Sequence, residues 1–281
     1  MRQKRAAALH DISCFGKCSL TVALPILSAA GIETAVIPTA VLSTHTGFKD
    51  YTFRDLTDDI LPVVIRWKDN SLEFDAIYTG YLGSLQQIDI IKEVISLLKG
   101  NIIIMVDPVM ADNGKLYGGF SEDFPKHMAT LCAKADIITP NITEACFMLG
   151  KPYIKGPYRK TQIEELLEGL KNITGGSIVL TGVYFEDAHL GAACFDKVSG
   201  KTSYAMGRKI DGNYHGTGDI FSSSLLGGLL NGKSLSEALH IAVGFVCECI
   251  CNTKENFTDM WYGVNFEDSL GKYMKLLGKD F

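Results

Sequence analysis

The sequence predicts an α/β fold: a single domain with a mostly parallel central sheet, helices on both faces and a small antiparallel edge. Short apolar runs rich in β-branched residues alternate with longer segments in which apolar residues recur every three or four positions. This alternation is typical of parallel strands joined by helices. It continues through the 281 residues without a linker or an internal repeat, so we expect one domain over residues 1–281.

Six segments have the composition and length of buried strands. They are residues 7–12, 33–39, 76–79, 102–106, 137–139 and 177–181. Between residues 184 and 206 the pattern changes to short pieces separated by glycines. This change predicts a hairpin of residues 192–196 with residues 202–205, which would form the antiparallel edge.

The helical segments have one apolar face, and several begin beside a Ser, Thr or Asp that can cap a helix. Those between the strands are residues 19–30, 88–99, 122–133, 143–149 and 161–172. The last third of the chain adds residues 219–230, 234–252 and 266–277. In a parallel sheet covered by such helices, ligands bind at the carboxyl ends of the strands, so the residues that follow each strand carry the functional information.

The composition is that of an ordinary globular protein, with 47% hydrophobic and 21% charged residues. The formal charge of −5 argues against a nucleic-acid-binding surface. The basic start is followed by too short an apolar stretch for a signal peptide, and we see no run approaching the roughly 18 apolar residues that span a bilayer. We therefore expect a cytoplasmic protein that binds neither nucleic acid nor membrane, and whose eight cysteines are reduced.

Residues 211–219 form a polar, glycine-rich segment that ends at an apolar helix, and its last four residues are Gly216, Thr217, Gly218 and Asp219. The first N–H groups of a helix lack a carbonyl partner within it and carry partial positive charge, and glycines let an anion approach closely. We interpret the first three residues as an anion hole and Asp219 as the general base of a phosphoryl transfer. The plainer alternative is a turn in which Asp219 is only the helix N-cap.

Hard oxygen ligands follow two other strands. Asp107 ends a buried strand, where a carboxylate is unfavourable unless it meets a cation or hydrogen-bond donors. Asn141 and Glu144 stand three residues apart at the start of a helix, so they share a face and suit a hydrated Mg²⁺. The alternative is that Asn141 is the helix N-cap and Glu144 its capping-box partner. A P-loop and the protein-kinase signature set are both missing from the sequence, which sets those kinase classes aside.

Together these motifs resemble those of the ribokinase-like superfamily and, within it, the pyridoxal kinases. They are Asp11-Ile12-Ser13, Ser43-Thr44-His45-Thr46-Gly47-Phe48, Thr79-Gly80-Tyr81-Leu82-Gly83, Asp107-Pro108-Val109-Met110, Thr139-Pro140-Asn141-x-x-Glu144 and Gly216-Thr217-Gly218-Asp219. The resemblance implies an ATP-dependent kinase that phosphorylates the 5′-hydroxymethyl group of pyridoxal, pyridoxamine or pyridoxine in vitamin B6 salvage. It also implies a homodimer, the use of Mg²⁺, and scope for a monovalent cation such as K⁺.

The resemblance assigns further roles by position. The acceptor would contact Ser13, Thr46, Tyr81 and Asp219, while His45 either lines the acceptor pocket or fixes its loop. ATP would contact Asp107, Asn141, Glu144 and Thr181. The metal would be held by Asn141, Glu144 and Asp112, and residues 111–119 would form a flap over ATP.

The first loop, residues 13–19, departs from the Gly-Tyr-Val-Gly type of run that is commoner in pyridoxal kinases, and this bears on ring specificity. The main alternative function is a hydroxymethylpyrimidine (phosphate) kinase of thiamin synthesis, a class that shares the Asp-Pro-Val-Met run but usually carries cysteine at the position of Asp219. A sugar kinase ranks third, because its usual Gly-Ala-Gly-Asp is missing here. From a different class, a non-catalytic metabolite sensor ranks low because the base and the oxygen ligands are intact.

Overall fold

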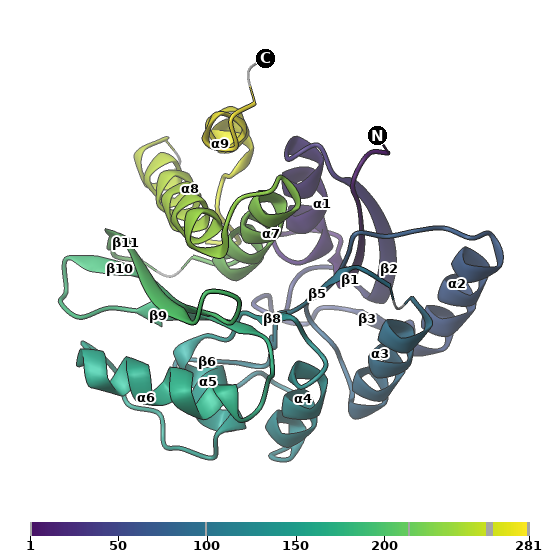
Figure 1. The fold of residues 1–281 in the computed structure, drawn as a ribbon, viewed down its shortest axis with the longest axis horizontal. Coiled ribbons are helices and arrows are strands. Elements are labelled where there is room, and N and C mark those ends of the chain that lie inside the picture. Colours follow the sequence, from purple (N-terminus) through teal and green to yellow (C-terminus); the bar gives the residue numbers. More distant parts are fainter. Residues whose placement is uncertain (1, 99, 213, 257–260, 280–281) are drawn as a thin grey trace.

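A computed structural model describes residues 2–98, 100–212, 214–256 and 261–279. Within these residues a nine-stranded sheet has the order β11-β10-β9-β8-β5-β4-β1-β2-β3 (Figure 1). Its strands are β1 Arg5–Ser13, β2 Glu33–Leu42, β3 Phe53–Asp55, β4 Ala76–Thr79, β5 Ile103–Val106, β8 Ile137–Ile138, β9 Ser177–Val183, β10 His189–Asp196 and β11 Lys201–Arg208. The neighbours from β9 to β2 run parallel, while β10, β11 and β3 are antiparallel to theirs. The predicted α/β fold and its antiparallel edge at β10 and β11 are confirmed.

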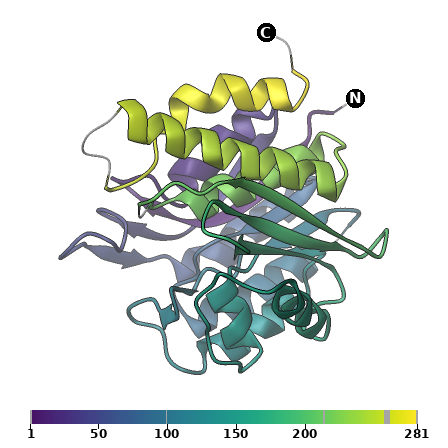
Figure 2. The ribbon, with the colours of Figure 1, turned by 90° about the vertical axis from the view of Figure 1, so that its left-hand side faces the viewer.

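Helices cover both faces of the sheet, as Figures 1 and 2 show from two sides. One face carries α2 Thr57–Asp69, α3 Leu85–Leu97, α4 Phe124–Cys132, α5 Ile142–Met148 and α6 Lys160–Lys171. The other carries α1 Leu20–Ala29, α7 Thr217–Leu230, α8 Leu235–Asn256 and α9 Leu270–Leu276, which follows a 3₁₀ turn at Glu267–Ser269. A two-stranded hairpin, β6 Ala111–Asp112 with β7 Lys115–Leu116, lies apart from the main sheet.

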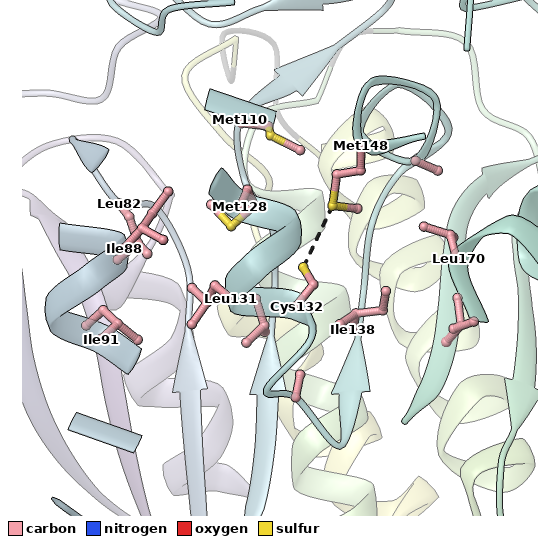
Figure 3. Packing of buried hydrophobic residues seen from close by; sticks show 14 of the residues in the cluster. Leu82, Ile88, Ile91, Met110, Met128, Leu131, Cys132, Ile138, Met148 and Leu170 are labelled. Atoms are coloured by element: carbon pink, nitrogen blue, oxygen red, sulfur yellow. Dashed lines mark hydrogen bonds between the residues drawn. The ribbon is translucent and has the colours of Figure 1, made fainter. Parts of the chain in front are cut away.

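Successive strand residues point to opposite faces, so each strand contributes to two cores. Ala7 and Ile138 pack under α2 to α6, whereas their neighbours Ala6 and Ile137 pack under the helices of the other face. Figure 3 shows part of the first core, where Cys132 Sγ lies 3.8 Å from Met148 Sδ. Burial on both faces is the reason why the parallel strands read as nearly continuous apolar runs.

The elements that were not predicted include α2, β3 and the short strands β6 and β7. The α2 sequence contains Pro62 followed by the β-branched Val63, Val64 and Ile65, a composition that disfavours a helix. The helix forms because one side of it, including Ile60 and Val64, is buried against the sheet, so tertiary packing overrides local propensity.

Most predicted helix boundaries are within two residues of those in the structure, and the largest differences are at α3, α8 and α9, which begins at Leu270 after a 3₁₀ turn rather than at residue 266. The helix predicted over residues 88–99 begins three residues earlier, at Leu85, where Ser84 accepts a hydrogen bond from the Gln87 N–H. It ends at Leu97, and Lys99, the last residue of the predicted segment, lies outside the described residues. α8 continues four residues beyond the predicted end, to Asn256.

By length and composition α8 could cross a membrane, contrary to the expectation from sequence that no segment would qualify. In the structure α8 packs against α7, β10 and β11, and 39% of its most apolar 18-residue window is buried. A core helix of this kind passes the same test of length and composition as a membrane span. Its apolar sequence is explained by its packing against the sheet.

Candidate active site

The fold brings the predicted site residues to one edge of the sheet. Strands β1, β2, β4, β5, β8 and β9 are parallel, so their carboxyl ends lie side by side. Ser13 and Thr181 lie within the last three residues of β1 and β9, and the segments that leave β2, β4 and β5 carry His45, Tyr81 and Asp107. The first turn of α7 reaches the same edge, because Asp219 on this turn contacts the loop that follows β1.

Gly216 is the N-cap of α7 and has a left-handed backbone with φ of 81°. A Cβ atom at this position would overlap the carbonyl oxygen of Lys17, so the close approach of the two segments requires glycine. Asp219 lies three residues further, inside the helix, which excludes the alternative that it is the N-cap. The N–H groups of Thr217 and Gly218 belong to the first turn, where a helix provides no carbonyl partner.

The Asp219 carboxylate accepts a hydrogen bond from the Ser19 N–H at 2.8 Å. Ser19 has a positive φ of 57°, an uncommon conformation for a residue with a side chain. The pKa of Asp219 is raised to about 7, mainly by burial, with the Ser19 hydrogen bond lowering it and the charge of Asp11 adding to the rise. A carboxylate with a pKa near neutrality can both exist as the base and accept a proton effectively.

Asp107 belongs to a buried chain of hydrogen bonds that also includes Ser222 of α7 and Thr139. Its carboxylate accepts a hydrogen bond from the Ser222 hydroxyl at 2.9 Å, and Ser222 Oγ lies 3.1 Å from Thr139 Oγ1. Ser222 is three residues after Asp219 and therefore on the same face of α7. Burial and then the charge of Asp219 raise the pKa of Asp107 to about 8.

Asn141 and Glu144 form a capping box at the start of α5. Asn141 Oδ1 accepts from the Glu144 N–H at 2.9 Å, and Glu144 Oε2 accepts from the Asn141 N–H at 2.8 Å. Glu144 Oε1 also accepts from the Met110 N–H at 3.0 Å, and Asn141 Nδ2 donates to the Ala111 carbonyl at 2.7 Å. Both side chains therefore hold the base of the β6–β7 hairpin, which is the segment predicted to be the flap.

Among the described residues, the structure contains no group of three or more His, Cys, Asp or Glu side chains arranged to hold a metal ion. Asp112 is exposed, and its two oxygens accept hydrogen bonds from the main chain and side chain of Asn113. Burial, however, raises the pKa values of Asp107, Glu144 and Asp219, the charge of Asp219 further raises the pKa of Asp107, and the charge of Asp107 further raises that of Glu144. This concentration of buried acidic groups fits a hydrated cation that is shared with substrate phosphates.

The acceptor side of the site contains Ser13, Thr46 and Tyr81. The Ser13 hydroxyl donates to the buried Asp11 carboxylate at 3.0 Å. Thr46 is exposed. The ring centroids of Tyr81 and Phe120 lie 5.6 Å apart in a tilted arrangement, and burial followed by the charge of Asp11 raises the pKa of Tyr81 to about 12.

His45 fixes its loop, which is one of the two roles predicted for it. The Gly47 N–H donates to Nδ1 at 3.1 Å, so the ring proton lies on Nε2, which donates to the Tyr262 carbonyl at 2.9 Å. Burial lowers the pKa of His45 and favours this neutral form. Its ring also lies 4.8 Å from that of His215, the residue before the anion hole.

Thr181 lies near the carboxyl end of β9, two residues before Val183, and forms a parallel bridge with Asn141. Its N–H donates to the Pro140 carbonyl at 2.9 Å. This contact connects the last parallel strand to the capping box, and the half-buried Thr181 lies next to the residues predicted to bind ATP.

Three residues of the site were not assigned a role from the sequence: Asp11, Ser19 and Ser222. The spacing of Ser222 from Asp219 is a helical repeat and could have indicated it. Asp11 stood within a quoted motif without a role of its own. Ser19 carried no signal, because its contribution is a backbone N–H whose direction depends on a positive φ.

Comparison with known proteins places this geometry in a family. A profile of the phosphomethylpyrimidine kinase family matches residues 24–261. A Bacteroides thetaiotaomicron protein with a provisional phosphomethylpyrimidine kinase assignment, crystallised with pyridoxal, matches with a TM-score of 0.91 and 36% identity over 100% of this chain and 97% of its own. Pyridoxal kinase from Lactobacillus plantarum matches with a TM-score of 0.88 and 32% identity over 98% of each chain.

A relative of known name extends the comparison to eukaryotes. Pyridoxal kinase from Dictyostelium discoideum is 28% identical over 242 residues, which cover 80% of this chain and 78% of that protein. The profile and the two solved relatives cover most or nearly all of the chain. The chain therefore belongs to the phosphomethylpyrimidine kinase family and is a kinase of the ribokinase-like superfamily, related to the pyridoxal kinases.

Proposed function

We propose that this kinase transfers the γ-phosphate of ATP to the 5′-hydroxymethyl group of pyridoxal, pyridoxamine or pyridoxine, which salvages vitamin B6 as pyridoxal 5′-phosphate. The observation that carries the proposal is Asp219, a carboxylate with a pKa of about 7 on the first turn of α7, beside the loop that follows β1. The pyridoxal bound by the Bacteroides relative and the pyridoxal kinase from Lactobacillus support the choice of acceptor.

In the proposed reaction Asp219 accepts the proton of the hydroxymethyl group as its oxygen attacks the γ-phosphorus. The Ser19 N–H orients the carboxylate so that one oxygen is held and the other can face the acceptor. The N–H groups of Thr217 and Gly218, together with Gly216 at the N-cap, stabilise the negative charge on the transferred phosphoryl group. This arrangement combines positioning and electrostatic stabilisation, the two contributions on which phosphoryl transfer depends.

On the donor side, we propose that ATP lies against Asp107, Thr181 and the β6–β7 hairpin. Asn141 and Glu144 contribute by fixing the base of this hairpin, since their side-chain oxygens already accept backbone N–H groups. Mg²⁺, when bound with ATP, supplies positive charge that neutralises the phosphates and the nearby carboxylates. Asp107 is the protein group best placed to approach it, with Glu144 and Asp112 as further candidates.

The second candidate function is phosphorylation of hydroxymethylpyrimidine or its phosphate. The description of the matching family and the provisional assignment of the Bacteroides relative favour it. Both acceptors are ring alcohols, so the same base and anion hole could serve either of them. A non-catalytic sensor, which ranked low from the sequence, would instead predict ligand binding without turnover.

A substrate screen tests these alternatives. Purified protein with Mg-ATP is offered the three B6 vitamers and hydroxymethylpyrimidine, and ADP formation is measured for each. Turnover of a vitamer is expected, while exclusive turnover of the pyrimidine would overturn the proposal in favour of the second candidate.

A pair of variants separates enzyme from sensor. Asp219→Asn should lower kcat by roughly 10²- to 10⁴-fold while acceptor binding persists. Asp211→Asn, the same change at an exposed position of the same segment, is the matched control and should keep normal turnover. Equal turnover in the two variants would remove Asp219 from the proposed role.

A further inference from the structure

Four aromatic rings from three distant segments gather on the acceptor side of the site. Phe15 belongs to the loop after β1, Phe48 to the loop after β2, and Trp261 and Tyr262 to the segment between α8 and α9. The ring centroids of Phe15 and Tyr262 are 5.1 Å apart, and those of Phe48 and Trp261 are 4.4 Å apart. Phe15 is 53% exposed and Trp261 is 50% exposed, so about half of each of these two side chains is accessible to solvent.

Polar contacts hold the C-terminal part of this cluster in place. The Tyr262 carbonyl accepts hydrogen bonds from His45 Nε2 at 2.9 Å and from the Lys17 N–H at 3.3 Å. Lys17 Nζ is paired with Glu267 at 2.6 Å. Gly263 packs so closely on Lys17 that a Cβ atom would overlap its side chain. The backbone that carries Trp261 is therefore anchored to the acceptor loops through groups other than the indole ring.

These rings adjoin the residues that the proposed reaction uses. Phe15 precedes Ser19, the partner of Asp219, by four residues, so their Cα atoms are at most about 14 Å apart. The carbonyl of Lys17 between them lies against Gly216. Half-exposed aromatic side chains on an anchored backbone beside a site are typical of a surface that receives an apolar or planar ligand.

We propose that Phe15, Phe48 and Trp261 form an aromatic wall that stacks on the planar six-membered nitrogen heterocycle of the acceptor, with Trp261 as a specificity-determining residue. The inference rests on the proposed function to the extent that the acceptor is a ring alcohol. A flat aromatic ring can make offset-stacked or edge-to-face contacts with this wall, whereas a puckered sugar alcohol offers it only C–H groups. The wall also lies in the region where the first loop departs from the pyridoxal kinase pattern, since Phe15 is part of that loop.

Fluorescence tests the contact directly, because the chain has only two tryptophans, Trp67 and Trp261. In Trp67→Phe protein, iodide quenches the half-exposed Trp261, and saturating pyridoxine without ATP should reduce the quenching constant by about half or more. In Trp261→Phe protein, where Trp67 on α2 is the remaining fluorophore, the same addition should leave the quenching unchanged. If the enzyme turns pyridoxine over but pyridoxine does not reduce the iodide quenching of Trp261, the proposed stacking on Trp261 is refuted and the proposed function stands.

Kinetics provide a second readout. Trp261→Ala should raise the KM for the vitamer roughly tenfold, with kcat and the KM for ATP within about twofold of wild type, and Trp261→Phe should restore most of the loss. Ile65→Ala, a truncation of an exposed apolar residue on α2, is the control and should change neither KM. An unchanged vitamer KM in Trp261→Ala would refute the inference. If only hydroxymethylpyrimidine is turned over, the same variants measured with that acceptor test the wall after the proposed function has failed.

Discussion

Asp219→Asn is expected to make the protein more stable at pH 8 while it removes activity. Burial raises the pKa of Asp219 from 3.8 to about 7, so the folded protein holds this proton more tightly than the unfolded chain does. Stability therefore falls as the pH rises from about 4 to about 7, and the loss is complete above the folded-state pKa. A shift of about three units corresponds to at most about 4 kcal/mol. Because Asp219 is partly exposed, we expect about 1–2 kcal/mol after solvent screening.

The measurement is urea unfolding of wild type and Asp219→Asn at pH 4.5 and at pH 8, without ligands. The asparagine cannot ionise, and its side-chain oxygen can still accept the Ser19 N–H, so the free energy of unfolding should gain about 1–2 kcal/mol at pH 8 and little at pH 4.5. Glu165→Gln removes an exposed carboxylate on α6 and should show no pH-dependent gain. A variant that is no more stable than wild type at pH 8, or whose gain is equal at both values, would contradict the assignment of a raised pKa.

Three further changes test other parts of the site. Gly216→Ala should lower both the thermal stability and kcat, the latter at least about 100-fold, because its Cβ would overlap the Lys17 carbonyl. Gly218→Ala, at an open position in the same turn, should fold normally. Equal thermal stability of the two variants would refute the predicted overlap at Gly216. Glu144→Ala should speed proteolysis within residues 111–119 and raise the KM for ATP, and Glu144→Gln, which keeps one of the two acceptor oxygens, should lie between it and wild type. Ser222→Ala should lower the free energy of unfolding by about 1–2 kcal/mol through loss of the hydrogen bond to Asp107. An unchanged free energy of unfolding in urea would show that this buried hydrogen bond contributes little to stability.

Local sequence was sufficient for the main elements and for the edge of the sheet that carries the site. Strands buried on both faces read as apolar runs, and the polar residues after them, such as Asp107 and Asn141, were identified because ligands bind at that edge. The predicted anion hole rests on two glycines at the start of an apolar helix, which the structure places at the N-cap and in the first turn of α7. Helix α2 was missed because Pro62 and three β-branched residues disfavour the helix that packing imposes.

The sequence by itself determined the α/β class, and it predicted the position of the site and the role of Asp219, because each depends on residue type and short-range spacing. The tertiary structure alone decided how these residues act. It placed the Ser19 N–H on Asp219, used Asn141 and Glu144 to hold the flap base, and brought Trp261 beside Phe48. These contacts join residues up to about 200 positions apart, and no local periodicity encodes them, because they depend on how the whole chain packs.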